Sequence, residues 1–166
     1  MFTKIIGIII ILAFGLTSCL KPEEFPKEPV IEFVSFTKMS DSADIIISFV
    51  DGDGDIGLQE SDTIGDFHSS QKYHHNLFVE YYEKHNANGW QIGKNLLGDD
   101  IVFKYRVPYL TPNGRNKALK GEIKVTIEPS YFNPLSSDSD TVKFKIYLVD
   151  RSFTESNVVE SNVVTR

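Results

Sequence analysis

"TVKFKIYLVD" (residues 141–150) alternates apolar and polar side chains along most of its length. Successive side chains of a strand point to opposite faces, so the apolar set falls on one side of an extended chain and the lysines fall on the other. The apolar set is Val142, Phe144, Ile146 and Leu148, and the lysines are Lys143 and Lys145. This period of two predicts a strand with one buried and one solvated face, as in an antiparallel sheet.

Other stretches rich in β-branched and aromatic residues predict further strands at residues 30–38, 44–50, 76–84, 101–110, 121–128 and 157–165. The dipeptide Asn88-Gly89 is a strong hairpin signal and predicts an additional strand from Trp90 that pairs back on 76–84. The segment "ESNVVESNVV" (155–164) repeats five residues, which is too short to indicate a repeat architecture. We therefore predict an all-β fold, an immunoglobulin- or fibronectin III-like antiparallel β-sandwich of seven or eight strands, with a closed barrel as the alternative.

The chain begins with the features of an export signal. Lys4 gives a positive start, and residues 5–16 form an apolar stretch that is shorter than the ~20 residues of a bilayer-spanning helix. The following "LTSC" (16–19) resembles the lipobox of bacterial lipoproteins, which implies cleavage before Cys19 and lipidation of its thiol. Cys19 is the only cysteine of the chain, so an intrachain disulfide is excluded. The alternative is an ordinary secretory signal with an incidental cysteine.

These features divide the chain into a signal peptide (1–18), a lipidated cysteine with a flexible, proline-containing tether (19–29) and one β-sandwich domain (30–166). The segment "KPEE" (21–24) is similar to signals of outer-membrane lipoproteins in Bacteroidota. We therefore expect a lipid-anchored outer-membrane protein on either the periplasmic or the cell-surface face. Removal of residues 1–18 takes away Lys4 and moves the net charge from −6 to −7, which argues against a nucleic-acid partner.

A second stretch, "VDGDGDIGLQESD" (50–62), places Asp51, Asp53 and Asp55 at every second residue with glycines between them. Carboxylates about 5.5 Å apart repel by roughly 0.75 kcal/mol per pair in water, and a hard divalent cation would remove that repulsion. Calcium binds roughly six to eight oxygens in flexible geometry, so it suits this loop better than magnesium or zinc. An EF-hand is rejected, because Ile56 stands where that loop has its glycine and because strands flank the stretch. The alternative is a solvated acidic turn.

Four segments together resemble a group of small Bacteroidota lipoproteins of uncharacterised role: "FVDGDGDIGL", "NLFVEYYEKHN", "LTPNGRNKALKGEI" and "IYLVDRSFTESNVV". The similarity covers essentially the whole mature chain. The matching residues are Asp51, Asp53, Asp55, Gly57, Asp150 and Arg151. The resemblance implies an immunoglobulin-like domain that carries a DGDGDIG motif, and it implies no activity.

In an immunoglobulin-like sandwich, the loop after the second strand and the loop after residues 141–150 emerge at the same end. We therefore expect Asp150 to complete a cation site with Asp51, Asp53 and Asp55. Arg151 has two interpretations: it neutralises the acidic loop in place of a metal, or it pairs with an outlying acid such as Glu60 or Asp62.

The sequence contains no Gly-x-Ser-x-Gly elbow and no P-loop, and no acid–base pair can be nominated, so we predict that the protein is not an enzyme. The favoured function is a calcium-binding adhesion or assembly module on a lipid tether, with a protein or glycan partner. The alternative is a carbohydrate-binding accessory lipoprotein of a glycan-uptake system. That alternative would need an exposed row of aromatic residues on one sheet, for which Tyr81, Tyr82 and Trp90 are candidates.

Overall fold

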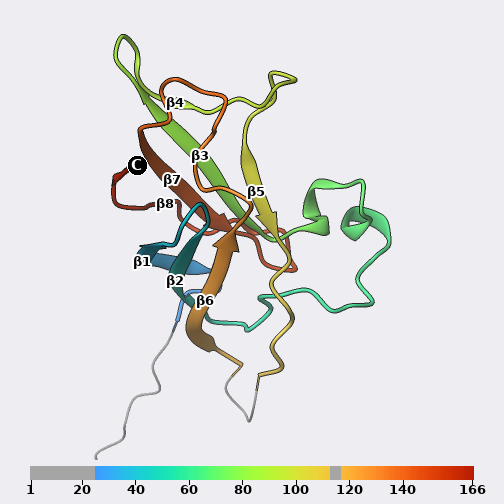
Figure 1. The fold of residues 1–166 in the computed structure, drawn as a ribbon. Coiled ribbons are helices and arrows are strands. Elements are labelled where there is room, and N and C mark those ends of the chain that lie inside the picture. The colour runs from blue at the N-terminus through green and yellow to red at the C-terminus, as the bar shows by residue number, and fades with distance from the viewer. Residues whose placement is uncertain (1–24, 113–116) are drawn as a thin grey trace, which may run out of the picture.

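The computed structural model describes residues 25–112 and 117–166. The expected signal peptide, Cys19 and the segment 21–24 therefore lie outside the described residues. Two antiparallel sheets pack face to face (Figure 1), which confirms the predicted β-sandwich. Within the described ranges, no helix is long and apolar enough to cross a bilayer.

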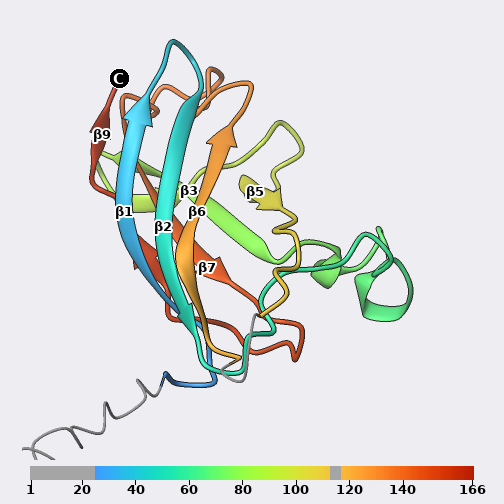
Figure 2. The same cartoon turned by 90° about the horizontal axis from the view of Figure 1, so that it is seen from below.

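One sheet has three strands in the order β1-β2-β6, and the other has six strands built around β3 and β7. The three-stranded sheet consists of β1 (Val30–Lys38), β2 (Ala43–Asp51) and β6 (Leu119–Ile127). The larger sheet consists of β3 (Leu77–His85), β4 (Gly89–Ile92), β5 (Val102–Tyr105), β7 (Thr141–Leu148), β8 (Val159–Glu160) and β9 (Val164–Thr165). Figure 2 shows the two layers with β1, β2 and β6 in front of β3 and β7.

The core lies between the inward faces of the two sheets. Alternate residues of β2 are fully buried from Ala43 onward, and alternate residues of β7 are buried in the same way. The largest fully buried side chains of the core include Ile45 and Ile47 of β2, Phe144 and Ile146 of β7, and Tyr81 of β3. The period of two that was visible in residues 141–150 thus fixes which face of each strand is inside.

The predicted final strand, 157–165, is divided into β8 and β9, so residues 25–112 and 117–166 contain nine strands and not seven or eight. Ser161 lies between β8 and β9, and Ser156 lies just before residue 157 and contacts β7 in the same way. Their hydroxyls accept the N–H groups of Leu148 and Phe144, each at 3.0 Å, and their own N–H groups donate to the carbonyls of the same residues. The two serines are five residues apart, whereas their partners on β7 are four apart. The edge therefore carries one extra, bulged residue between the two serines.

The strand predicted at residues 101–110 is shorter in the structure, because β5 spans only Val102–Tyr105. Beyond it, the side chain of Asn76 takes the place of a neighbouring strand: its Oδ1 accepts the N–H of Val107 at 2.6 Å. β4 and β5 lie along the same edge of β3, one after the other. The hairpin predicted at Asn88-Gly89 is confirmed by the pairing of β3 with β4.

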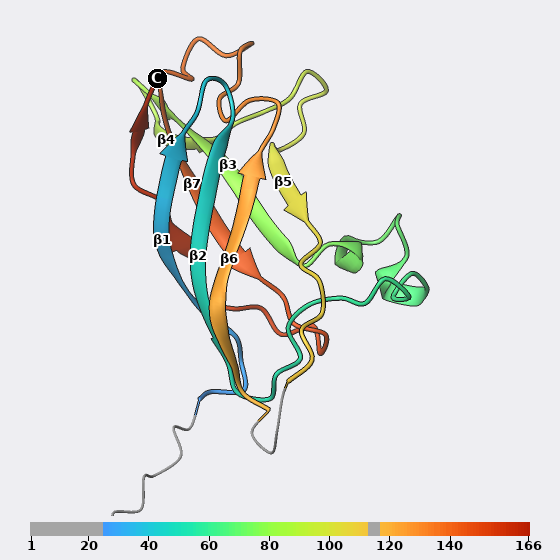
Figure 3. The ribbon, with the colours of Figure 1, turned by 60° about the horizontal axis from the view of Figure 1, so that its bottom comes forward.

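Loops gather at the two ends of the sandwich (Figure 3). At one end, the N-terminal segment enters β1 and the chain leaves β2 at Asp51; the N–H of Gly52 donates to the carbonyl of Pro26 at 2.8 Å. The other end carries the β4–β5 connection and the β6–β7 connection. These two ends hold the two polar sites described below.

Candidate metal centre

Asp51 is the last residue of β2 and continues the row of inward-facing side chains that begins at Ala43. Every earlier member of that row is apolar, so the strand's period of two carries a carboxylate to the edge of the core. Asp51 is 0% exposed. A carboxylate in this position must be hydrogen-bonded or paired with a cation, because burying it without a partner is costly.

One carboxylate oxygen of Asp51 organises the loop. Its Oδ2 accepts the N–H groups of Asp55 at 2.9 Å and Ile56 at 3.2 Å, which curls residues 51–56 into a tight turn. Gly54 allows this turn, because its φ is +70° and a Cβ there would lie 1.9 Å from the carbonyl oxygen of Lys117. The sequence of alternating aspartate and glycine thus produces a loop that brings its acidic side chains together.

Asp51, Asp53 and Asp55 each contribute one oxygen to a group in which all ligand atoms lie within 4.8 Å of one another. Oδ2 of Asp55 accepts the hydroxyl of Ser152 at 2.7 Å. Oδ1 of Asp51 and Oδ1 of Asp55 are buried and have no hydrogen-bond partner among the described residues. An ionised carboxylate oxygen only accepts, so these two atoms are available to a cation.

The charges of the cluster are not balanced within it. Burial raises the pKa of Asp51 to about 7, and the neighbouring charges of Asp53 and Asp55 add to the increase. Arg151, the candidate counter-ion, instead pairs with Asp62: its Nη1 contacts Oδ2 and its Nη2 donates to Oδ1 at 3.4 Å. The second interpretation of Arg151 is therefore confirmed.

The loop that follows β7 lies against the acidic loop, as predicted. The N–H of Arg151 donates to the carbonyl of Asp55 at 3.3 Å, and Ser152 contacts the Asp55 carboxylate. Asp150 is 4% exposed and accepts the N–H of Thr154 at 2.8 Å, so it holds its own turn. It is not among the three residues whose ligand atoms converge. A role for Asp150 as a fourth ligand stays a prediction.

The long connection between β2 and β3 contains two short 3₁₀ turns, Gly65–Phe67 and Lys72–His74. Arg106, which the sequence did not single out, holds this connection in place. Arg106 donates to the carbonyl oxygens of Gln59 at 2.6 Å, Asp62 at 2.8 Å and His74 at 2.8 Å. In the sequence, Arg106 is one of two positive charges in an aromatic stretch, together with Lys104, and this pattern does not identify distant carbonyl acceptors. Arg106 therefore fixes the position of the loop that follows the acidic cluster.

The candidate sugar-binding residues Tyr81, Tyr82 and Trp90 do not form an exposed, uncovered row of rings. Tyr81 is part of the core and is 1% exposed. On the outer face, the ammonium of Lys145 lies 4.8 Å from the ring of Tyr82, and that of Lys143 lies 4.9 Å from the ring of Trp90. Each lysine therefore lies over one face of its ring, which reduces the aromatic surface open to a sugar.

The chain matches no protein-family model, no curated protein and no solved structure. Its function is therefore inferred from the chemistry of its own sites, because a β-sandwich fold hosts many unrelated functions.

Proposed function

We propose that this protein is a lipid-anchored, non-catalytic adhesion or assembly module whose β-sandwich binds calcium at Asp51, Asp53 and Asp55. The observation that supports the metal most directly is the Oδ1 atom of Asp51. It is buried, it lacks a hydrogen-bond partner among the described residues, and it belongs to a group of three converging carboxylates. A cation is the partner that satisfies this oxygen and also offsets the repulsion among the three charges.

Calcium is favoured over other metals by the donor atoms. The group contains carboxylates only, with no histidine or cysteine, and hard oxygen donors suit calcium better than zinc or copper. Calcium also accepts the irregular geometry of a loop, whereas magnesium requires a nearly ideal octahedron. We expect a dissociation constant of extracellular grade, on the order of 10⁻⁴ to 10⁻³ M.

The position of the cluster supports a structural role for the metal. The loop at Asp51 touches the chain that leads to the proposed lipid anchor, since Gly52 hydrogen-bonds to Pro26. A Cβ at Gly52 would lie 2.4 Å from the carbonyl oxygen of Phe25, so the two segments are closely packed. The loop after β7 contacts the same cluster through Ser152. Calcium bound there would join three segments that are distant in sequence.

A calcium titration followed by thermal denaturation tests this proposal. The chain from residue 19 onward, without acylation, keeps every described residue. At a calcium concentration of 100 times the dissociation constant, its free energy of unfolding should rise by about 2.7 kcal/mol, which corresponds to roughly 10 °C in Tm. The double variant Asp53→Asn, Asp55→Asn should lose this increase.

The matched control is Glu60→Gln, Asp66→Asn, which removes two exposed carboxylates from the same long connection. It should keep the full calcium effect. Equal melting temperatures in calcium and in chelator for the parent protein would show that the acidic loop is a hydrated turn and that the proposal is wrong.

The carbohydrate-binding function is the competing hypothesis. A stacked pair, Phe78 and Tyr147, with ring centroids 4.9 Å apart, lies on the same face of the larger sheet as Tyr82, and this is the observation in its favour, although Phe78 is only 2% exposed. The lysines over Tyr82 and Trp90 count against it. A glycan-array screen of the chain from residue 19 onward separates the two hypotheses. Sustained binding to one polysaccharide would support the carbohydrate-binding function and contradict the adhesion or assembly function.

A further inference from the structure

A second buried carboxylate lies at the end of the sandwich opposite to Asp51. Glu83 is the last inward-facing residue of a row on β3 whose earlier members are Leu77, Val79 and Tyr81. It is 3% exposed, although it belongs to a residue type that is almost never fully buried without a partner. The period of two in β3 therefore carries an acidic side chain to the edge of the core, as it does in β2.

The two oxygens of Glu83 have different surroundings. Oε2 accepts the hydroxyl of Ser136 at 2.6 Å, and the Nε2 atom of His85 lies 3.7 Å from it. Oε1 is buried and has no hydrogen-bond partner among the described residues. One acceptor of a buried carboxylate is thus left to an external donor.

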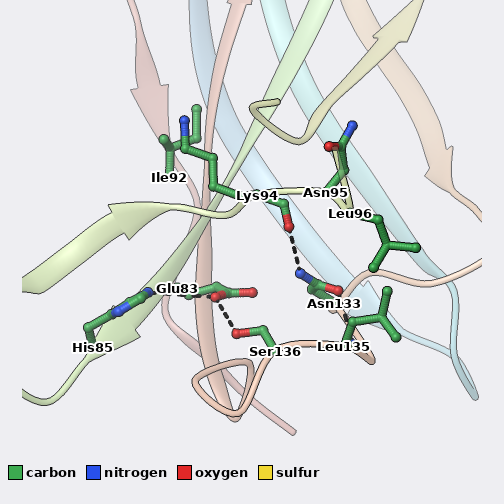
Figure 4. Close-up of a pocket in the computed structure, with 9 residues that line it drawn as sticks. All are labelled: Glu83, His85, Ile92, Lys94, Asn95, Leu96, Asn133, Leu135 and Ser136. Carbon is green, nitrogen blue, oxygen red and sulfur yellow. Dashed lines mark hydrogen bonds and ion pairs between the residues drawn. The ribbon is translucent and has the colours of Figure 1, made fainter. Parts of the chain in front are cut away.

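Two polar groups near Glu83, the ammonium of Lys94 and the hydroxyl of Tyr81, do not pair with Oε1. The ammonium of Lys94 pairs with Asp100, and Figure 4 shows it directed away from Glu83. The hydroxyl of Tyr81 accepts the N–H of Asn133 at 3.0 Å. Burial raises the pKa of Tyr81, and the charge of Glu83 and a hydrogen bond to its carboxylate add to the increase, so the phenol lies close to Glu83. The Oε1 atom of Glu83 itself still has no hydrogen-bond partner among the described residues.

Glu83 forms the floor of a pocket of about 300 Å³ (Figure 4). The walls come from the β4–β5 and β6–β7 connections. Leu96 and Leu135 stand at the rim, and they are 82% and 67% exposed. The pocket therefore combines an acidic floor with an apolar entrance.

We propose that this pocket binds an aliphatic primary ammonium group, with Glu83 Oε1 accepting one of its hydrogens and the leucines at the rim covering its alkyl chain. The volume suits a ligand of about the size of a lysine side chain, since it lies at the lower limit of ligand pockets. This inference concerns a site separate from the acidic cluster and does not depend on calcium.

Other ligand classes fit less well. A guanidinium group prefers to pair with both oxygens of a carboxylate, but Oε2 of Glu83 is already occupied by Ser136. A divalent metal would need further ligands. His85 and Asp138 are candidates, since Nε2 of His85 lies 3.7 Å from Glu83 and its Nδ1 lies 3.4 Å from Asp138. Their ligand atoms do not converge with those of Glu83, whereas in the described part of the chain those of Asp51, Asp53 and Asp55 do. A neutral alcohol would leave the buried charge uncompensated.

NMR titration of the chain from residue 19 onward tests the proposal with n-pentylamine, which is protonated at pH 7. We expect saturable shifts of the backbone amides at residues 83, 94–96, 133, 135 and 136, with a dissociation constant in the millimolar range, as befits so small a ligand. 1-Pentanol has the same chain without the charge and should bind at least about tenfold more weakly. Comparable binding of the two compounds would overturn the proposal.

Glu83→Gln keeps the shape of the side chain and should weaken n-pentylamine binding by about tenfold or more. A second variant, Leu96→Ala with Leu135→Ala, changes exposed rim residues only and so leaves the core intact. It should weaken n-pentylamine binding several-fold, because the alkyl chain loses its cover, while leaving the binding of methylamine unchanged. The control Glu32→Gln, at an exposed site on β1, should bind like the parent.

An ammonium group could come from a lysine side chain of a partner protein or from a free amine, and Nα-acetyl-lysine methylamide distinguishes these two sources. Binding of this compound with the affinity of n-pentylamine would identify a lysine side chain of a partner as the ligand, whereas binding of n-pentylamine alone would identify a free amine. Either result supports the ammonium site. Absence of saturable shifts with both compounds, or unchanged binding to Glu83→Gln, would refute it.

Discussion

Replacing Asp51 by asparagine should make the protein more stable in the absence of calcium. In the parent, Oδ2 of Asp51 accepts two backbone N–H groups while Oδ1 faces other carboxylates without a partner. The amide oxygen of the new side chain accepts the same two N–H groups. Its NH₂ group donates toward Asp53 and Asp55, so a repulsion is replaced by an attraction.

The size of the effect follows from the pKa of Asp51. Burial and the neighbouring charges raise this pKa from 3.8 to about 7. Each pKa unit corresponds to about 1.36 kcal/mol, so ionising Asp51 in the folded protein costs up to roughly 4 kcal/mol. Local relaxation reduces this cost, and we expect Asp51→Asn to raise the free energy of unfolding by about 2 to 4 kcal/mol at pH 8 in chelator.

The pH dependence has a definite sign. Because the pKa of Asp51 is higher in the folded chain than in the unfolded chain, the folded chain binds this proton more tightly. The stability that this proton gives to the parent is therefore fully present below about pH 4 and is lost as the pH rises toward about 7. The free energy of unfolding of the parent, relative to that of the variant, falls over this range. Calcium should reverse the trend, since it stabilises the parent by about 2.7 kcal/mol at 100 times the dissociation constant and the variant hardly at all.

Denaturant unfolding of both proteins, in chelator and in calcium between pH 4 and pH 8, provides the measurement. Asp66→Asn, at an exposed position of the same connection, is the control and should change stability by no more than about 0.5 kcal/mol. If Asp51→Asn proves less stable than the parent in chelator at pH 8, then Asp51 is already compensated and the reasoning fails.

Three further changes test other parts of the molecule. Cys19→Ala should move the protein from the detergent phase to the soluble fraction in a phase-partition experiment, and continued membrane association at full mass would contradict lipidation. Gly54→Ala should lower the free energy of unfolding by at least about 2 kcal/mol, because φ is +70° and the new Cβ meets the carbonyl of Lys117; an unchanged urea midpoint would contradict this. Ser161→Ala should cost about 1 to 3 kcal/mol and speed amide exchange at Phe144, whose N–H loses its acceptor, while Ser137→Ala serves as the exposed control.

The strands could be predicted because their signal is local. Residues 30–38 form a strand with the predicted limits, and 44–50 differs from β2 by one residue at each end. The division of 157–165 could not be predicted, because it depends on which backbone groups of β7 the hydroxyls of Ser156 and Ser161 meet. Such pairings between distant segments leave no periodic trace in the chain.

The two acidic sites also differ in how local their signal in the sequence is. Asp51, Asp53 and Asp55 are close in sequence, so their spacing alone predicted that they converge. Glu83 is isolated in sequence, and its pocket is built from connections that lie 10 or more residues away along the chain. A signal was nevertheless present, since the alternation of β3 assigns Glu83 to the buried face, where a lone carboxylate is unexpected.

The entry of the chain into β1 has a mechanical consequence. The N-terminal segment joins β1 at the end of the sandwich where β2 finishes, and β1 pairs with β2 from Val30 opposite Val50 to Lys38 opposite Ala43. A pull between a membrane anchor and a partner held at the Glu83 end would act along the strands. Because hydrogen bonds of an antiparallel pair are perpendicular to the strands, this force shears them together and does not open them one at a time. If the chain is anchored through Cys19 as proposed, detachment under tension would have to break the pairing of β1 along its whole length.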